Sequence, residues 1–157
     1  MVRPTVLFSI LLVFSLAITG SAQVKSLQEE QDYAFALGLF KDQNYQLSYE
    51  KFNAFVESYP QSALLPDASY YCAESQYQNA NLPDAAILFS RFRERYPDSK
   101  LADDAGFREG EVYFRQGRFT KAHEVFGDVV KRYPEGNLAH ESAYWAGEAA
   151  FKDGNLL

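Results

Sequence analysis

The sequence is poor in the residues from which disulfide-bonded domains and many metal centres are built. Its 157 residues include one cysteine, one methionine, one tryptophan and two histidines. A single cysteine excludes an internal disulfide framework. Cys72 lies in an apolar stretch, where we expect a small buried side chain. The alternative is a disulfide between two molecules, which an exported chain would permit.

The sequence motifs of catalysis are also missing. It contains no Gly-x-Ser-x-Gly elbow, phosphate-binding glycine loop or dinucleotide fingerprint. His123 and His140 fall on different predicted elements, and neither has an acid or cysteine at a ligand spacing. Asp103 and Asp104 begin a predicted helix, where the helix dipole accounts for them. We therefore predict a protein that is not an enzyme, with no catalytic residues, no cofactor and no metal ion.

Positive charge is in deficit. There are 15 Lys and Arg against 21 Asp and Glu, a net charge of −6. Residues 1–22 contain one charged residue, Arg3. Without them the sequence has 14 Lys and Arg against 21 Asp and Glu, a net charge of −7. An acidic chain lacks the basic footprint of nucleic-acid binding and the polybasic segments that dock on anionic lipid.

The one long apolar run is too short to span a membrane. It covers the 13 residues Val6 to Ile18, follows Arg3, and is followed by the small residues Thr19 to Ala22. A spanning helix needs about 20 residues, whereas this layout is typical of a secretory signal peptide. We therefore predict a signal peptide over 1–22, no membrane span after its removal, and export to the periplasm or cell envelope. No cysteine follows the predicted cleavage site, which argues against a bacterial lipoprotein anchor.

The remaining sequence repeats at a step of 37 residues. A Tyr-Pro pair marks each unit, at Tyr59-Pro60, Tyr96-Pro97 and Tyr133-Pro134. Further positions keep the step, namely Ala36, Ala73, Gly110 and Gly147; Ser48, Ala85 and Ala122; and Phe52, Phe89 and Phe126. A fixed period indicates a repeat architecture. The units are 29–65, 66–102, 103–139 and a partial unit 140–157.

Each unit carries two amphipathic helix patterns with apolar spacings of three and four. The predicted helices cover 27–42, 45–58, 64–79, 82–95, 101–116, 119–132 and 138–153. Gly117 suits the left-handed residue between two helices, Pro66 and Pro83 suit first turns, and Asn81 suits a helix cap. No stretch alternates strictly enough to predict a strand. We expect an all-α solenoid over 23–157, in which the small residues let helices cross closely and the phenylalanines fill the space beside them.

The third unit shows the order small, aromatic, small, aromatic, proline, at Gly110, Tyr113, Gly117, Phe119, Ala122, Phe126 and Pro134. This order resembles the tetratricopeptide repeat (TPR), with three residues added to the usual step of 34. The long inter-repeat turn is similar to that of the Tol-Pal-associated periplasmic coordinator and of the outer-membrane assembly TPR lipoprotein. The resemblance covers 29–157. Two features of those proteins have no counterpart here: an N-terminal coiled coil before Glu29 and the lipid-bearing cysteine.

The resemblance implies a concave groove lined by the first helix of each unit, in which a peptide or partner protein binds. Its candidate residues form three columns at the 37-residue step: Tyr33, Tyr70, Phe107 and Tyr144; Leu37, Glu74, Glu111 and Glu148; and Phe40, Tyr77, Phe114 and Phe151. We expect a ligand with apolar anchors and some basic character, held as a helix or strand. Two alternatives stay open. The aromatic residues could belong to the core, and Glu111 with Arg115 could be ordinary i, i+4 helix support.

The last unit contains only a first helix before Leu157. An uncovered end is unusual, because terminal repeats normally cap a solenoid. Three interpretations follow: an exported interaction scaffold acting in envelope assembly, division or secretion; an N-terminal recruiting module of a longer envelope protein or enzyme; or a structural solenoid that self-associates through its fourth unit.

Overall fold

The structure, a computed structural model, describes residues 26–154, and within this range it contains seven helices and no strand. The first helical segment covers 26–41. The others are α2 (Tyr45–Ser58), α3 (Leu65–Gln78), α4 (Leu82–Arg95), α5 (Ala102–Arg115), α6 (Phe119–Arg132) and α7 (Ala139–Lys152). The predicted all-α solenoid is confirmed. The predicted signal peptide, 1–22, lies outside the described residues.

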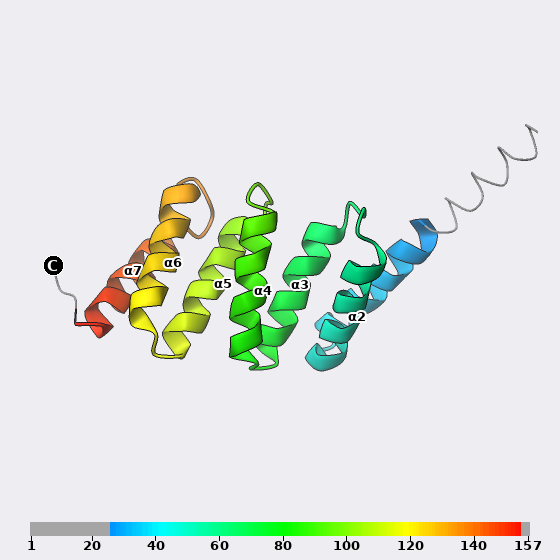
Figure 1. The fold of residues 1–157 in the computed structure, drawn as a ribbon, viewed down its shortest axis with the longest axis horizontal. Helices are drawn as coiled ribbons and strands as arrows, with labels where there is room; N and C mark the ends of the chain where they lie inside the picture. Colours follow the sequence, from blue (N-terminus) through cyan, green and yellow to red (C-terminus); the bar gives the residue numbers. More distant parts are fainter. Residues whose placement is uncertain (1–25, 155–157) are drawn as a thin grey trace, which may run out of the picture.

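The helices lie side by side in chain order, forming an elongated row (Figure 1). Segment 26–41, α3, α5 and α7 are the first helices of successive units, and α2, α4 and α6 are the second helices. Each helix packs mainly against its neighbours in sequence. A surface made by one kind of helix therefore runs along the whole row, as in other stacked repeats.

The Tyr-Pro pair ends each second helix. Tyr59, Tyr96 and Tyr133 leave the helical conformation, with φ between −124° and −130°, because a following proline disfavours the α region. The chain then turns tightly: the amide of Ser99, for example, donates to the carbonyl of Tyr96 at 3.1 Å. The proline predicted in the first turn of the next helix is confirmed at Pro66.

One left-handed residue follows each first helix, again at the 37-residue step. These residues are Gln43, Ala80, Gly117 and Gly154, with φ of 60°, 60°, 72° and 76°. The prediction for Gly117 is confirmed. The same conformation at Gln43 and Ala80 was not predicted, although both lie in register with Gly117. A side chain with a Cβ is strained there.

The small residues allow close helix crossings where the second helix is present. Phe52, Phe89 and Phe126 are fully buried, and a Cβ on Gly110 would lie 2.5 Å from the Phe126 ring. In the first unit, the Ser48 hydroxyl donates to the Ala36 carbonyl at 3.2 Å. Gly147 is the exception, since no described side chain comes within 4 Å of where its Cβ would lie.

Two single-residue expectations have different outcomes. Cys72 is buried as expected, with 4% of its surface exposed, and this burial raises the pKa of its thiol to about 12. Asn81 takes the N-cap position of α4, as predicted, but its side chain makes no capping hydrogen bond. Its Nδ2 donates instead to the side chain of Asp84 at 2.7 Å.

Candidate partner-binding face

The first column of predicted groove residues packs within its own repeat. Tyr33 meets the Phe52 ring at 5.7 Å between centres, Tyr70 meets Phe89 at 5.9 Å and Phe107 meets Phe126 at 5.5 Å. Tyr70 and Phe107 are only 8% and 6% exposed. Burial also raises the pKa of Tyr33 to about 12 and that of Tyr70 further. These rings are therefore placed as the packing alternative expected, in the core between the two helices of a repeat.

The third column joins each repeat to the next. Phe40 lies 5.2 Å from the ring of Tyr71, and Phe114 lies 5.2 Å from the ring of Trp145. Between them, Tyr77 lies 5.2 Å from the guanidinium carbon of Arg108. The three partners, Tyr71, Arg108 and Trp145, occupy one position of the 37-residue step. Sequence analysis missed this position because its three residues differ in chemical type, although the step alone could have found it.

The acidic column is split between buried and accessible positions. Glu74 is 5% exposed; its carboxylate accepts from Nε2 of Gln78 at 2.7 Å and lies 3.4 Å from Nε of Arg108. Burial raises the pKa of Glu74, and the positive charge of Arg108 opposes this rise. Arg108 also donates to Glu111 at 2.6 Å. One arginine of α5 thus neutralises two members of the column.

The i, i+4 pair considered for α5 does not form. Glu111 pairs with Arg108, three residues earlier. The guanidinium of Arg115 lies instead over the ring of Tyr77, 5.2 Å from its centre. Two arginines of α5, Arg108 and Arg115, therefore contact the ring of Tyr77. These contacts fix α5 against α3.

On α7 the same columns are open. Tyr144 is 62% exposed and Phe151 is 57% exposed, whereas their counterparts in earlier repeats pack against a second helix. Glu148 is partly exposed. The accessible candidates are thus those of α7 together with candidates that are partly exposed, namely Tyr33, Leu37, Phe40, Tyr77, Glu111 and Phe114.

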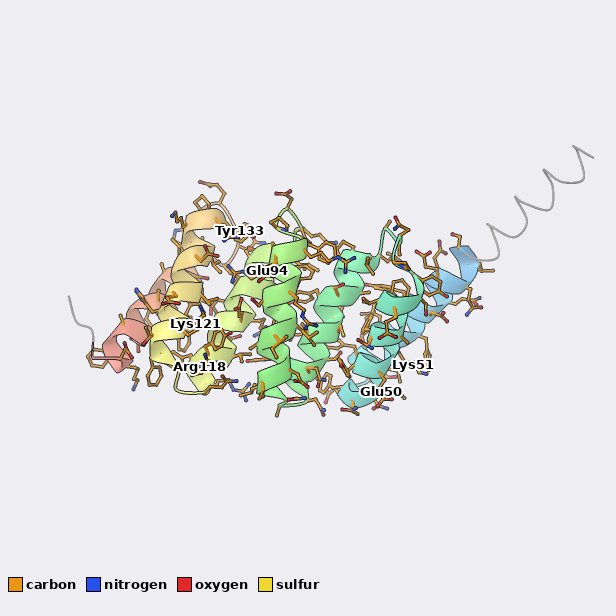
Figure 2. All side chains as sticks on the ribbon, in the orientation of Figure 1. Glu50, Lys51, Glu94, Arg118, Lys121 and Tyr133 are labelled. Atoms are coloured by element: carbon orange, nitrogen blue, oxygen red, sulfur yellow. The ribbon has the colours of Figure 1, made fainter. Side chains whose placement is uncertain are left out.

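The second helices present a different surface. Glu50 and Lys51 of α2, Glu94 of α4 and Lys121 of α6 (Figure 2) are all exposed. Lys121 pairs only locally, with Glu124 at 3.1 Å. His123 of α6 is exposed, and its Nδ1 lies 2.9 Å from the carbonyl oxygen of Ala146. This face is mixed in charge, as solvated helix surfaces usually are.

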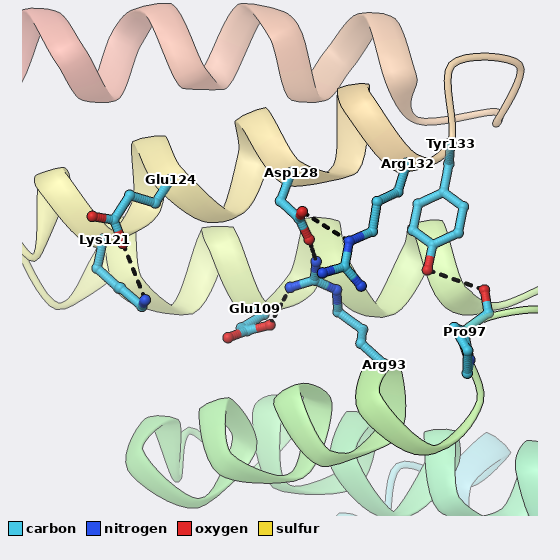
Figure 3. A network of polar contacts seen from close by, with 8 residues as sticks. All are labelled: Arg93, Pro97, Glu109, Lys121, Glu124, Asp128, Arg132 and Tyr133. Atoms are coloured by element: carbon cyan, nitrogen blue, oxygen red, sulfur yellow. Dashed lines mark hydrogen bonds and ion pairs between the residues drawn. The ribbon is translucent and has the colours of Figure 1, made fainter.

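One buried polar network crosses the middle of the row (Figure 3). Arg93 of α4 donates to Glu109 of α5 at 2.7 Å and also contacts Asp128 of α6. Asp128 in turn accepts from Arg132 at 2.8 Å. Burial raises the pKa of Glu109, and its hydrogen bond from Arg93 opposes the rise. At the same position of the step the other repeats carry Val56 and Val130 in place of Arg93, so this network is peculiar to one junction.

Residues 26–154 contain no cluster of three or more His, Cys, Asp or Glu side chains arranged to bind a metal ion. None of the helices in this range combines the length and apolar character needed to cross a bilayer.

Comparison with known proteins identifies the type of repeat. Residues 25–113 match the model of the YfiO family, described as an outer membrane lipoprotein, and residues 107–157 match a tetratricopeptide repeat model. No curated protein matches the sequence. Among solved structures, the chain is similar to the TPR-like repeats of a protein assigned as a kinesin light chain of Podospora anserina. That match has 13% identity and a TM-score of 0.63, and it covers 80% of this chain and 66% of the other. At this identity it shows the fold alone, which is the predicted TPR solenoid.

Proposed function

Because this chain belongs to the YfiO family of outer membrane lipoproteins, we propose that it is a protein-interaction scaffold of the bacterial cell envelope. In this proposal it holds a segment of a partner protein along the face made by its first helices. The protein acts by binding and not by catalysis, and residues 1–22 direct its export. The family is one of lipoproteins, but the only cysteine of this sequence, Cys72, is buried in α3. The assignment to the family therefore rests on the match of the helical repeats.

The observation that carries the proposal is the linkage between successive first helices. The pairs Phe40–Tyr71 and Phe114–Trp145, and the contact between Tyr77 and Arg108, recur at one position of each junction. Such contacts hold the first helices at fixed spacing, and a preorganised surface loses less conformational entropy when a ligand binds. The face is therefore suited to an extended or helical segment that spans several repeats.

Burial narrows the choice of contact residues and of ligand. Tyr70, Phe107 and Glu74 are buried, so we assign direct contact to the members that stay accessible: Phe40, Tyr77, Glu111, Phe114, Tyr144 and Glu148. Arg108 already neutralises Glu74 and Glu111. The preference for a basic ligand therefore rests on Glu148. We expect most of the binding to come from apolar groups of the ligand that contact the aromatic residues of this face.

Position-specific photocrosslinking in the source cells tests this function. A photoreactive benzoylphenylalanine is placed at Tyr144 or Glu111 on the first helices, with matched positions at the exposed Lys121 and Lys131 on the second helix α6. We expect a discrete crosslinked product from the first-helix positions only. Equal products from all four positions, or products from Lys121 and Lys131 alone, would overturn the assignment of the binding face.

A further inference from the structure

A second surface lies away from the first-helix face, in a cleft between α2, α3 and α4. The apolar side chains of Val56, Leu88 and Phe92 line it, together with Cys72 of α3, and its volume is about 170 Å³. An engineered protein cavity of about 150 Å³ with apolar walls is large enough to bind benzene. This cleft therefore has room for one aliphatic side chain.

The cleft is open because of a difference between repeats. Residues 56, 69, 72 and 91 correspond, one step of 37 later, to residues 93, 106, 109 and 128. At the later junction the long side chain of Arg93 crosses this region and reaches Glu109 and Asp128. At the earlier junction Val56 and Cys72 stand in place of Arg93 and Glu109. The shorter side chains leave an apolar space at the earlier junction. At the later junction the side chain of Arg93 fills the corresponding space.

The rim of the cleft is positively charged. Arg91 and Arg95 of α4 both line it, and neither forms an ion pair with any described residue, whereas Arg93 between them is paired twice. The guanidinium of Arg95 lies 5.5 Å from the ring centre of Tyr96. The nearest acidic side chain along α2, Glu57, accepts a hydrogen bond from Asn53 at 2.9 Å. Arg91 takes the place that Asp128 has at the later junction, so the sign of the charge is reversed there.

One residue of the lining, Tyr96, also carries a polar group without a partner. The hydroxyl of Tyr96 is buried and has no hydrogen-bond partner among the described residues. Its counterparts do: Tyr59 donates to Asp32 at 2.6 Å, and Tyr133 donates to the carbonyl of Pro97 at 3.1 Å. An unpaired buried hydroxyl is unfavourable, and an acceptor on a bound ligand would relieve this.

We propose that this cleft binds an acidic segment of a partner protein, with one aliphatic side chain inserted between Val56 and Phe92 and carboxylates facing Arg91 and Arg95. The proposal is independent of the function assigned to the first-helix face, because the two surfaces differ in their lining residues, their charge and their preferred ligand. An acidic ligand is selected here, whereas the first-helix face presents Glu148.

Fluorescence anisotropy with synthetic peptides tests the proposal on the chain as it exists. The probe is a labelled nonapeptide with a central leucine flanked by glutamates; two matched peptides replace the leucine by alanine or the glutamates by lysines. We expect the probe to bind saturably. Each of the two matched peptides should bind with an affinity about ten-fold lower. Nuclear magnetic resonance titration of the unaltered protein should shift the methyl signals of Val56 and Leu88.

Variants of the rim provide the matched control. Arg91→Glu should weaken binding of the probe about ten-fold, while Lys131→Glu, which makes the same charge change at an exposed position of α6, should not. No binding at millimolar peptide, equal loss in both variants, or methyl shifts confined to the first helices would overturn the proposal. Methyl shifts that depend on protein concentration without any peptide would show that a second copy occupies the cleft, and would also overturn it.

Discussion

The guanidinium of Arg108 lies 5.2 Å from the ring centre of Tyr77 and also 3.4 Å, through Nε, from the buried carboxylate of Glu74. It thus replaces, at the middle junction, the aromatic contacts that Tyr71 and Trp145 make at the neighbouring junctions. A single side chain of α5 both covers a ring of α3 and balances a buried charge there.

Arg108→Ala should therefore destabilise the protein by about 2 kcal/mol, because it leaves the Glu74 carboxylate buried without its cation. Arg115→Ala is the control: it removes only a contact with the same ring, and should cost about 0.5 kcal/mol. Urea unfolding followed by circular dichroism measures both. Equal losses would mean that the ring contact, and not the buried charge, accounts for the effect of Arg108.

The raised pKa of Glu74 predicts the pH dependence of a second variant. The folded protein holds the proton of Glu74 more tightly than the unfolded chain. The contribution of Glu74 to stability therefore increases as the pH falls from 7 towards the unfolded value of 4.5. Glu74→Gln has no proton to bind. The stability of the unaltered protein minus that of Glu74→Gln should rise over this interval, as measured by urea unfolding at several pH values; a difference that falls on acidification would contradict a raised pKa for Glu74.

Two glycines at the same position of the repeat should respond in opposite directions to alanine. A Cβ on Gly110 would lie 2.5 Å from the fully buried ring of Phe126, so Gly110→Ala should cost about 1–3 kcal/mol. The space beside Gly147 is open, and Gly147→Ala should stabilise α7 by about 1 kcal/mol because alanine favours a helix. Thermal unfolding compares the two. Similar changes in both variants would show that helix propensity outweighs the crossing distance.

The left-handed residues offer a reciprocal test. Ala80 has φ of 60°, where an L side chain is strained, so Ala80→Gly should stabilise the protein by about 0.5–1 kcal/mol. Gly117 has φ of 72°, and Gly117→Ala should be destabilising by about 1 kcal/mol. Thermal melting temperatures should move up for the first variant and down for the second. A fall in both would mean that Ala80 makes a contact worth more than its backbone strain.

The helices were predictable from sequence because their signals are local. Apolar residues at spacings of three and four, with Tyr-Pro pairs at a fixed step, are properties of the chain itself, and the predicted and observed helix ends agree within one residue. Ala80 was missed for the opposite reason. Its conformation is imposed by the tight connection between α3 and α4, and alanine carries no sequence signal for a positive φ.

The candidate face was predicted only in part. The columns containing Tyr70 and Tyr77 do recur along the first helices, as expected. The surroundings of a member depend on the residue that the next first helix places against it: Tyr71 lies against Phe40, and Arg108 lies against Tyr77. Such a pairing between chemically unlike residues follows from three-dimensional packing and not from periodicity.

The buried arginine at the centre of the row has a consequence for how the chain avoids assembling wrongly. Repeats that resemble one another invite a helix to pack one unit too early or too late, a known hazard of repeat proteins. The position of Glu109 is held by Cys72 one unit earlier and by Ala146 one unit later. Any such slip would bury the charge of Arg93 against a partner that cannot balance it, at a cost of several kcal/mol. The ion pair thus distinguishes one junction from its near copies, and makes the order of the units part of the energetics of folding.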